Sequence, residues 1–111
     1  MSPRARRIAE LNDQLRETFH TGRVFLTSGI ISLPDEERER VMQKVRTFTG
    51  FNADNDPNDE HDFGAIAVAG VGKILWKIDY YYTADEAYQS PDPAVPALTR
   101  RVLTIMLASE Y

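Results

Sequence analysis

The segment FGAIAVAGVGKILWKIDYYY, residues 63–82, decides how this chain folds. Its two halves, residues 63–68 and 73–82, are rich in apolar, β-branched and aromatic residues, and the glycines between them favour a chain reversal. Side chains alternate between the two faces of a strand. One face of the second half therefore carries Ile74, Trp76, Ile78 and Tyr80. We predict an antiparallel hairpin that turns this face toward the core.

The chain before the hairpin begins with a predicted helix. It covers residues 3–19, starting at Ser2-Pro3, because serine caps a helix and proline is tolerated in its first turn. Gly22 is expected to end it, since glycine adopts the left-handed conformation that closes helices. Its apolar residues recur at spacings of three and four, and so lie on one face. They are Ile8, Leu11, Leu15 and Phe19.

A short strand and a second helix are predicted next. Residues 23–27 are β-rich and lie between glycines, which is typical of a strand, and residues 28–32 resemble a turn. Pro34 then opens a helix whose first turn is acidic, where acids complement the positive end of the helix dipole. This helix ends by Gly50, and its buried stripe consists of Val41, Val45 and Phe48.

One more strand is predicted after the hairpin. Residues 83–98 are a connection whose prolines prevent a long helix. Residues 100–107 form a nearly continuous apolar run that suits a strand or a helix by length, and we favour a buried strand. The predicted order is α-β-α-β-β-β. We therefore expect an α+β fold of one domain, residues 1–111, with two helices packed on one face of a small, mostly antiparallel sheet.

Composition narrows the possible classes of function. The chain of 111 residues has no cysteine, which excludes disulfides and thiolate metal ligands. Its net charge is −4, and residues 51–111 hold ten Asp and Glu against four Lys and Arg, so we expect a protein partner with a basic surface and no direct contact with nucleic acid. No apolar run suits a membrane span, and the arginine-rich start lacks the apolar region of a signal peptide, so a cytoplasmic protein is expected.

An acidic loop, residues 52–62, is the main candidate for a binding surface. Its Asn, Asp and Pro residues favour turns, and loops of this length are often functional. Nearby tyrosines strengthen the prediction, since tyrosine supplies a large contact area with a polar tip. The predicted partner-binding residues are Asp54, Asp56, Asp59, Tyr81, Tyr82 and Tyr88.

The same loop opens like a calcium-binding loop. Asp54-x-Asp56-x-Asn58 has the alternating oxygen ligands that wrap a calcium ion. The pattern then fails, because Asp59 stands where glycine is required and Ala65 stands where the bidentate glutamate is required. A solvated loop, or one bound by a basic partner, is the better interpretation.

A tighter cluster provides the enzymatic alternative. A reversal around Gly70 would pair position 63 with about position 78, and so bring Asp62 opposite Asp79. An imidazole and carboxylates there can hold a divalent metal and activate water. In the competing interpretation, Arg100 or Arg101 neutralises the acids in a structural network. The metal ligands of the enzymatic alternative are His61, Asp62 and Asp79, and its catalytic residues are Glu60, His61, Asp62, Lys77 and Asp79.

Three segments together resemble a known family: residues 60–64 (EHDFG), 76–81 (WKIDYY) and 101–111 (RVLTIMLASEY). From Ile8 to Tyr111 the chain resembles small uncharacterised proteins of alphaproteobacteria and their plasmids, which share a domain of unknown function. The resemblance implies a single-domain bacterial protein encoded near mobile-element genes, and it implies no catalytic residues. The chain departs from the family pattern at Tyr82, where an acid is expected, and at Gln89, where glycine is expected.

Two classes of function follow. We expect a non-enzymatic protein-interaction module without a cofactor, and the resemblance suggests an inhibitor, encoded by a mobile element, of a host defence or nucleic-acid-processing protein. The alternative is a metal-dependent hydrolase or nuclease that uses the cluster of residues 60–62 with Asp79. A toxin-like ribonuclease is a third possibility, against which the acidic charge counts.

Overall fold

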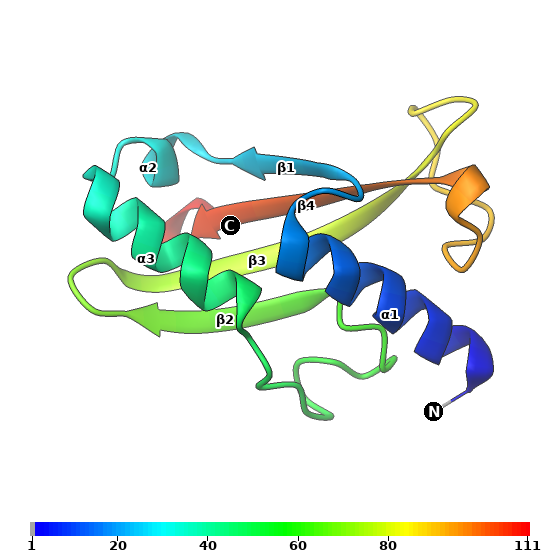
Figure 1. Ribbon diagram of the computed structural model, residues 1–111, viewed down its shortest axis with the longest axis horizontal. Coiled ribbons are helices and arrows are strands. Elements are labelled where there is room, and N and C mark those ends of the chain that lie inside the picture. Colours follow the sequence, from blue (N-terminus) through cyan, green and yellow to red (C-terminus); the bar gives the residue numbers. More distant parts are fainter. Residues whose placement is uncertain (1) are drawn as a thin grey trace.

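Four strands form a single sheet in the order β1-β4-β3-β2 in the computed structural model, which describes residues 2–111 (Figure 1). β1 runs parallel to β4, and the other two pairings are antiparallel. The predicted α+β class and mostly antiparallel sheet are confirmed. The elements in chain order are α1 (Pro3–Thr18), β1 (Arg23–Leu26), α2 (Ser28–Ile31), α3 (Asp35–Arg46), β2 (Phe63–Val68), β3 (Gly72–Tyr82), the 3₁₀ turn η1 (Pro96–Leu98), β4 (Thr99–Leu107) and the 3₁₀ turn η2 (Ala108–Glu110).

The predicted hairpin forms, with a register one residue away from the predicted one. Phe63 pairs with Lys77, where the sequence placed position 78. The reversal is tight: the Val71 N–H donates to the Val68 carbonyl at 3.0 Å, and Gly70 adopts a φ of 81° that only glycine accepts without strain. The Ile78 N–H consequently donates to the Asp62 carbonyl at 2.9 Å. Asp62 therefore lies opposite Ile78, and the predicted pairing of Asp62 with Asp79 is wrong.

Helices α1 and α3 cover one face of the sheet, and the core lies between them and the strands (Figure 1). The face of β3 predicted to be apolar points into this core, where Trp76 and Ile74 are fully buried. The other face of the sheet carries no helix of the described chain. The buried core cluster consists of Leu15, Ile30, Val41, Val45, Val68, Ile74, Trp76, Ile78, Leu103 and Ile105.

Helix α1 ends earlier than predicted and by a different residue. Phe19 takes the left-handed conformation, with φ 62°, and its N–H donates to the Leu15 carbonyl at 2.7 Å. The conformation is unusual for a bulky residue, and the Arg46 guanidinium lies 4.3 Å from the centre of the Phe19 ring. Gly22 has another role, since a Cβ there would come within 2.7 Å of the Arg101 carbonyl oxygen.

Two further elements differ from the predictions. Residues 28–31, predicted as part of a turn, form the one-turn helix α2, which buries Ile30 completely. Helix α3 follows Pro34 and ends by Gly50, as expected. Its last residue is Arg46, so Phe48, predicted as part of its buried stripe, lies beyond the helix. The strand chosen for residues 100–107 is confirmed as β4, which pairs with β1 and β3.

Within residues 2–111, no helix combines the length and apolar character that crossing a membrane requires.

Candidate functional site

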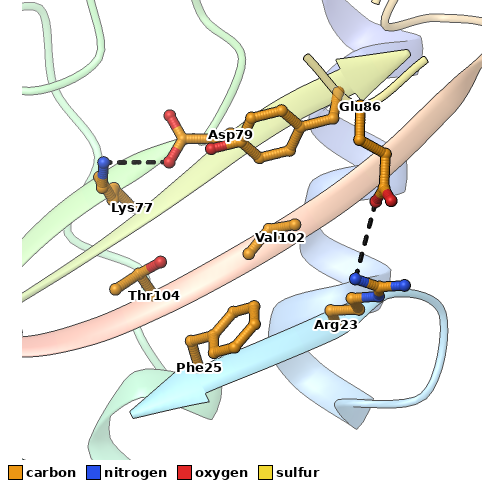
Figure 2. Close-up of a pocket in the computed structure, with 8 residues that line it drawn as sticks. Arg23, Phe25, Lys77, Asp79, Glu86, Val102 and Thr104 are labelled. Atoms are coloured by element: carbon orange, nitrogen blue, oxygen red, sulfur yellow. Dashed lines mark ion pairs between the residues drawn. The ribbon is translucent and has the colours of Figure 1, made fainter. Parts of the chain in front are cut away.

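A groove of about 440 Å³ lies on the helix-free face of the sheet, formed by three strands and the connection after β3 (Figure 2). We call it the sheet-face groove. Its position follows from the register, because Lys77 pairs with Thr104 and Asp79 with Val102, while β1 lies on the far side of β4. The lining residues are Arg23, Phe25, Lys77, Asp79, Tyr81, Glu86, Val102 and Thr104.

The floor and one wall of the sheet-face groove are apolar. Val102 of β4 is buried in the floor, and Phe25 of the edge strand β1 stands beside it with 55% of its surface exposed (Figure 2). The alternation of β1 explains this placement, since Val24 and Leu26 pack on the core and Arg23 and Phe25 point the other way. The groove therefore offers an aromatic side chain that the described chain leaves uncovered.

Ion pairs form the rim of the groove. The Lys77 ammonium lies 3.0 Å from Asp79 Oδ2, and this hydrogen bond raises the pKa of Lys77. Glu86 Oε1 lies 3.6 Å from the Arg23 guanidinium and 3.2 Å from that of Arg100 (Figure 2 shows the first of these). Exposed pairs of this kind contribute little stability, so the charges remain available to another molecule.

A smaller hollow of about 180 Å³ adjoins the sheet-face groove and shares Asp79 and Tyr81 with it. It lies beside the start of β2: the Ser90 N–H donates to the Tyr80 carbonyl at 3.0 Å, so the chain near Gln89 pairs with the edge of β3 beyond Asp62. We call it the acidic hollow. Its lining residues are Asp62, Ile78, Asp79, Tyr80, Tyr81 and Gln89.

Asp62 is a half-buried acid with acidic neighbours. Burial raises the pKa of its carboxyl, and the negative charges of Glu60, Asp56 and Asp79 raise it further. Its own backbone N–H acts in the opposite direction. Among residues 2–111, no basic side chain forms an ion pair with Asp62.

The acidic loop divides into exposed and buried acids. Asp54 and Asp59 are exposed, as a partner-binding surface requires. Asp56 is only 4% exposed, and its Oδ1 accepts the backbone N–H groups of Glu60 and His61 at 3.0 and 3.1 Å. The prediction that Asp56 contacts a partner is therefore wrong, because its carboxylate holds the loop together from inside.

His61 is bound within the same structure. Its Nδ1 lies 2.9 Å from Asp13 Oδ1, and its ring stacks on Phe51 with centroids 3.8 Å apart. Asp13 also pairs with the buried guanidinium of Arg16 at 3.0 Å. The imidazole thus joins the loop to α1. Its Nδ1 is engaged by Asp13, and one face of its ring is covered by Phe51.

Glu60 belongs to a second internal network, centred on the fully buried Asn12. The Asn12 amide donates to the Glu60 carbonyl at 2.9 Å and to the Tyr80 hydroxyl at 2.8 Å, and its oxygen accepts from Arg101 Nε at 2.8 Å. The Tyr80 hydroxyl in turn donates to the Glu60 carboxylate at 3.1 Å. Burial raises the pKa of Tyr80 well above its usual range and lowers that of Arg101.

The predicted neutralisation of Asp62 and Asp79 by Arg100 or Arg101 is wrong. Arg101 contacts Asn12 and the Pro93 carbonyl, and Arg100 pairs with Glu86. Neither arginine forms an ion pair with Asp62 or Asp79, and it is Lys77 that pairs with Asp79.

The proposed catalytic cluster is consequently divided among three environments. Glu60 lies in the Asn12 network, His61 lies between Asp13 and Phe51, and Asp62 lies in the acidic hollow with Asp79. Within residues 2–111, no three His, Asp or Glu side chains converge in a way that could hold a metal ion.

Of the predicted site residues, Lys77, Asp79 and Tyr81 do come together, in the sheet-face groove. Tyr88 is exposed outside it, and Tyr82 is half-buried. The sequence prediction did not include Arg23, Phe25, Glu86, Val102 or Thr104. The alternation in residues 23–26 was a usable signal for Phe25, because a strand that buries Val24 and Leu26 exposes its neighbours.

The fold and groove define an α+β protein with a two-helix layer on one sheet face and a charged, aromatic groove on the other. The family model described as protein of unknown function (DUF3768) matches residues 26–110, and the chain belongs to that family. The matched region begins at the end of β1, so α1 lies outside it. No curated protein matches the chain. No solved structure matches it either.

Proposed function

We propose that this protein is a protein-binding module whose partner docks in the sheet-face groove. The observation that carries the proposal is Phe25, which is 55% exposed beside the apolar floor formed by Val102. An apolar centre with a polar, charged rim is the usual composition of a protein interface. Aromatic side chains in such centres often carry much of the binding free energy.

The proposal moves the interface away from the acidic loop. Asp56 holds that loop together internally, whereas Tyr81 lines the groove as a partner-binding tyrosine should. The charges at the rim belong to weak, exposed ion pairs, so they can exchange partners when another chain binds. The narrower role, inhibition of a host defence or nucleic-acid-processing protein by a mobile-element product, is supported by the sequence resemblance alone.

Metal-dependent hydrolysis is less well supported by the same geometry. Asp79 would have to leave Lys77, and His61 would have to leave Asp13, before either residue could ligate a metal. Both rearrangements break contacts that the chain already makes at 3.0 Å or less. Binding of a protein partner without catalysis requires neither rearrangement.

A pull-down that compares wild-type protein with the variant Phe25→Ser tests the proposal. Tagged wild-type protein is expected to recover a specific protein from a lysate of its host, and Phe25→Ser is expected to lose it. Ile31→Ser is the matched control, since Ile31 is 59% exposed on α2, which contributes nothing to the groove. Substitutions at exposed sites change stability by about 0.5 kcal/mol, so both variants should fold. Equal recovery by Phe25→Ser and wild type would remove the groove as the interface.

A further inference from the structure

A further pocket, of about 250 Å³, lies on the helix-covered face of the sheet, at the end of the molecule where α1 approaches η1 (Figure 1). We call it the α1 pocket. Its walls come from α1, from Thr21 just after that helix, and from the chain that leads from η1 into β4. No residue lines both this pocket and the sheet-face groove, so a role for it goes beyond the proposed function.

Arg101 enters the α1 pocket from β4. Side chains alternate along a strand, and the neighbouring Val102 lies in the floor of the sheet-face groove, so Arg101 points the other way, toward α1. Its Nε donates to Asn12 Oδ1 at 2.8 Å, and its Nη2 donates to the Pro93 carbonyl. The residue is only 5% exposed. These contacts hold the guanidinium in one position at the base of the pocket.

The positive charge of Arg101 has no acid to balance it. Among residues 2–111, Arg101 forms no ion pair, and no group accepts a hydrogen bond from its Nη1. Burial lowers the pKa of Arg101 and the charge of Arg7 lowers it further, while Tyr80 and Glu60 act in the opposite direction. A buried charge without a partner is costly, so an anion bound beside Arg101 would be stabilising.

Arg7 supplies a second positive charge from the wall formed by α1. Its ion pair with Glu10, at 3.6 Å, joins two exposed side chains and is therefore weak. Among the described residues, no Asp or Glu lines the pocket, whereas Gln14 and Thr21 add an amide and a hydroxyl that can donate hydrogen bonds. The polar part of the pocket thus consists of donors and positive charges, which favours an anionic ligand.

The remaining wall of the pocket includes apolar surface from Leu11 and Pro96. A water molecule occupies about 30 Å³ in the liquid, so the pocket has room for more than a bare ion. Guanidinium groups match both carboxylates and phosphates, because their N–H groups bond two oxygens of the same ligand at once. A ligand that fills the pocket would combine such a group with an apolar part.

We propose that the α1 pocket binds a small organic anion, whose carboxylate or phosphate group lies between Arg7 and Arg101 and whose apolar part lies against Leu11 and Pro96. The rigid position of Arg101 supplies the fixed contact of this site. Arg7 is exposed on α1 and supplies the contact that a substitution can remove without disturbing the core.

A titration of the full-length protein followed by NMR tests this site. The probes are phenyl phosphate, benzoate and benzamide, which share an aromatic ring and differ in the head group, benzamide being uncharged. At least one of the two anions is expected to bind saturably and to shift the backbone amide signals of Gln14, Thr21 and Arg101, whereas benzamide is not. Tighter binding of phenyl phosphate would assign the ligand as a phosphate ester, and tighter binding of benzoate would assign it as a carboxylate.

Substitutions on α1 assign the contact. Arg7→Gln is expected to weaken binding of the anion about tenfold, since it removes one charged hydrogen-bond donor. Arg6→Gln is the matched control, because it removes the same charge from an exposed neighbour that lies outside the pocket, and it should bind as wild type does. Phe25→Ser should also bind as wild type does, so this test does not depend on the proposed function.

Three results would overturn the inference. One is the absence of saturable binding by both anions, and another is binding of benzamide as tight as that of benzoate. The third is equal weakening by Arg6→Gln and Arg7→Gln, which would mean that the anions respond to the general charge of α1 and not to a site. Each of these results would leave the proposed function of the sheet-face groove standing.

Discussion

Gly64 of β2 lies directly opposite Trp76 of β3, and the indole occupies the space that a side chain at Gly64 would need. A Cβ built on Gly64 would come within 2.7 Å of Trp76 Cε2. The φ of Gly64 is not positive, so the requirement for glycine comes from packing and not from the backbone. Both residues belong to the predicted hairpin, and their contact forms part of the core under α3.

Gly64→Ala is expected to destabilise the protein by about 1–3 kcal/mol, because a methyl group forced into a packed core displaces the indole. Urea unfolding measured through fluorescence of Trp76, the single tryptophan, reports both the loss and the displaced ring. Gly50→Ala is the control, since a Cβ there would meet only the far end of the Phe48 ring, at 3.3 Å, on an exposed loop. Equal unfolding midpoints for the two variants would contradict this role of Gly64.

Much of the fold was predictable because it is decided by neighbours in the sequence. The alternating pattern of β3 correctly predicted which of its faces lies in the core, and the apolar run of β4 correctly predicted a strand. Features that depend on distant contacts were missed. Helix α2 is only four residues long and is ordered by burying Ile30 in the core, and Phe19 ends α1 while packing against Arg46 of α3.

The candidate site was less predictable than the fold, for the same physical reason. The sheet-face groove requires Phe25 to lie beside Val102, which depends on the parallel pairing of β1 with β4. The two strands are separated by most of the chain, and no local pattern specifies that pairing. An error of one residue in the hairpin register was enough to place Asp62 opposite the wrong neighbour.

Asn12→Ala is expected to destabilise the protein by about 2–4 kcal/mol. The change removes hydrogen bonds to Glu60, Tyr80 and Arg101, and it leaves a buried guanidinium nitrogen without its acceptor. Denaturant unfolding measures the loss. Gln14→Ala, at an exposed position of the same helix, should change stability by no more than about 0.5 kcal/mol. If Asn12→Ala and Gln14→Ala unfold at the same denaturant concentration, the network does not stabilise the fold.

Asp56→Ala is expected to loosen the acidic loop and to cost about 1–3 kcal/mol. The carboxylate accepts two backbone N–H groups, and one of them belongs to His61, whose φ of 56° is unusual for a residue with a side chain. Limited proteolysis should cut the loop of the variant faster than that of wild type. Asp54→Ala removes an exposed acid of the same loop and should leave the cleavage rate unchanged. Similar rates for both variants would contradict an internal role for Asp56.

Asp62→Asn is expected to stabilise the folded protein at pH 7. Burial and three acidic neighbours raise the pKa of Asp62, so its ionisation costs more free energy in the folded state than in the unfolded one. This cost is absent below the ordinary carboxyl pKa of about 4, grows as the pH rises through the folded-state pKa, and then stays constant. Unfolding of variant and wild type should thus coincide near pH 3 and diverge toward pH 7, with the variant more stable. A less stable variant at pH 7 would show that Asp62 has a stabilising partner.

Glu110→Gln is expected to show the opposite dependence on pH. The Thr27 hydroxyl donates to the Glu110 carboxylate at 2.6 Å, and the backbone N–H groups of Leu107 and Gly29 donate at 2.8 and 3.0 Å. These bonds lower the pKa of Glu110, with the one from Thr27 having the largest effect. A carboxylate with a lowered folded-state pKa stabilises the protein above its unfolded-state pKa, and the stabilisation is lost as the pH falls through the folded-state pKa.

Thermal unfolding at pH 7 and near pH 3 measures the effect of this substitution. Glu110→Gln should melt below wild type at pH 7, and the difference should shrink as the pH falls and the wild-type carboxylate begins to take up its proton. The control is Glu39→Gln, which removes an exposed carboxylate from α3 and should leave the melting temperature close to that of wild type at both pH values. A difference between Glu110→Gln and wild type that stays constant with pH would mean that the shape of Glu110, and not its charge, holds η2 against the start of α2.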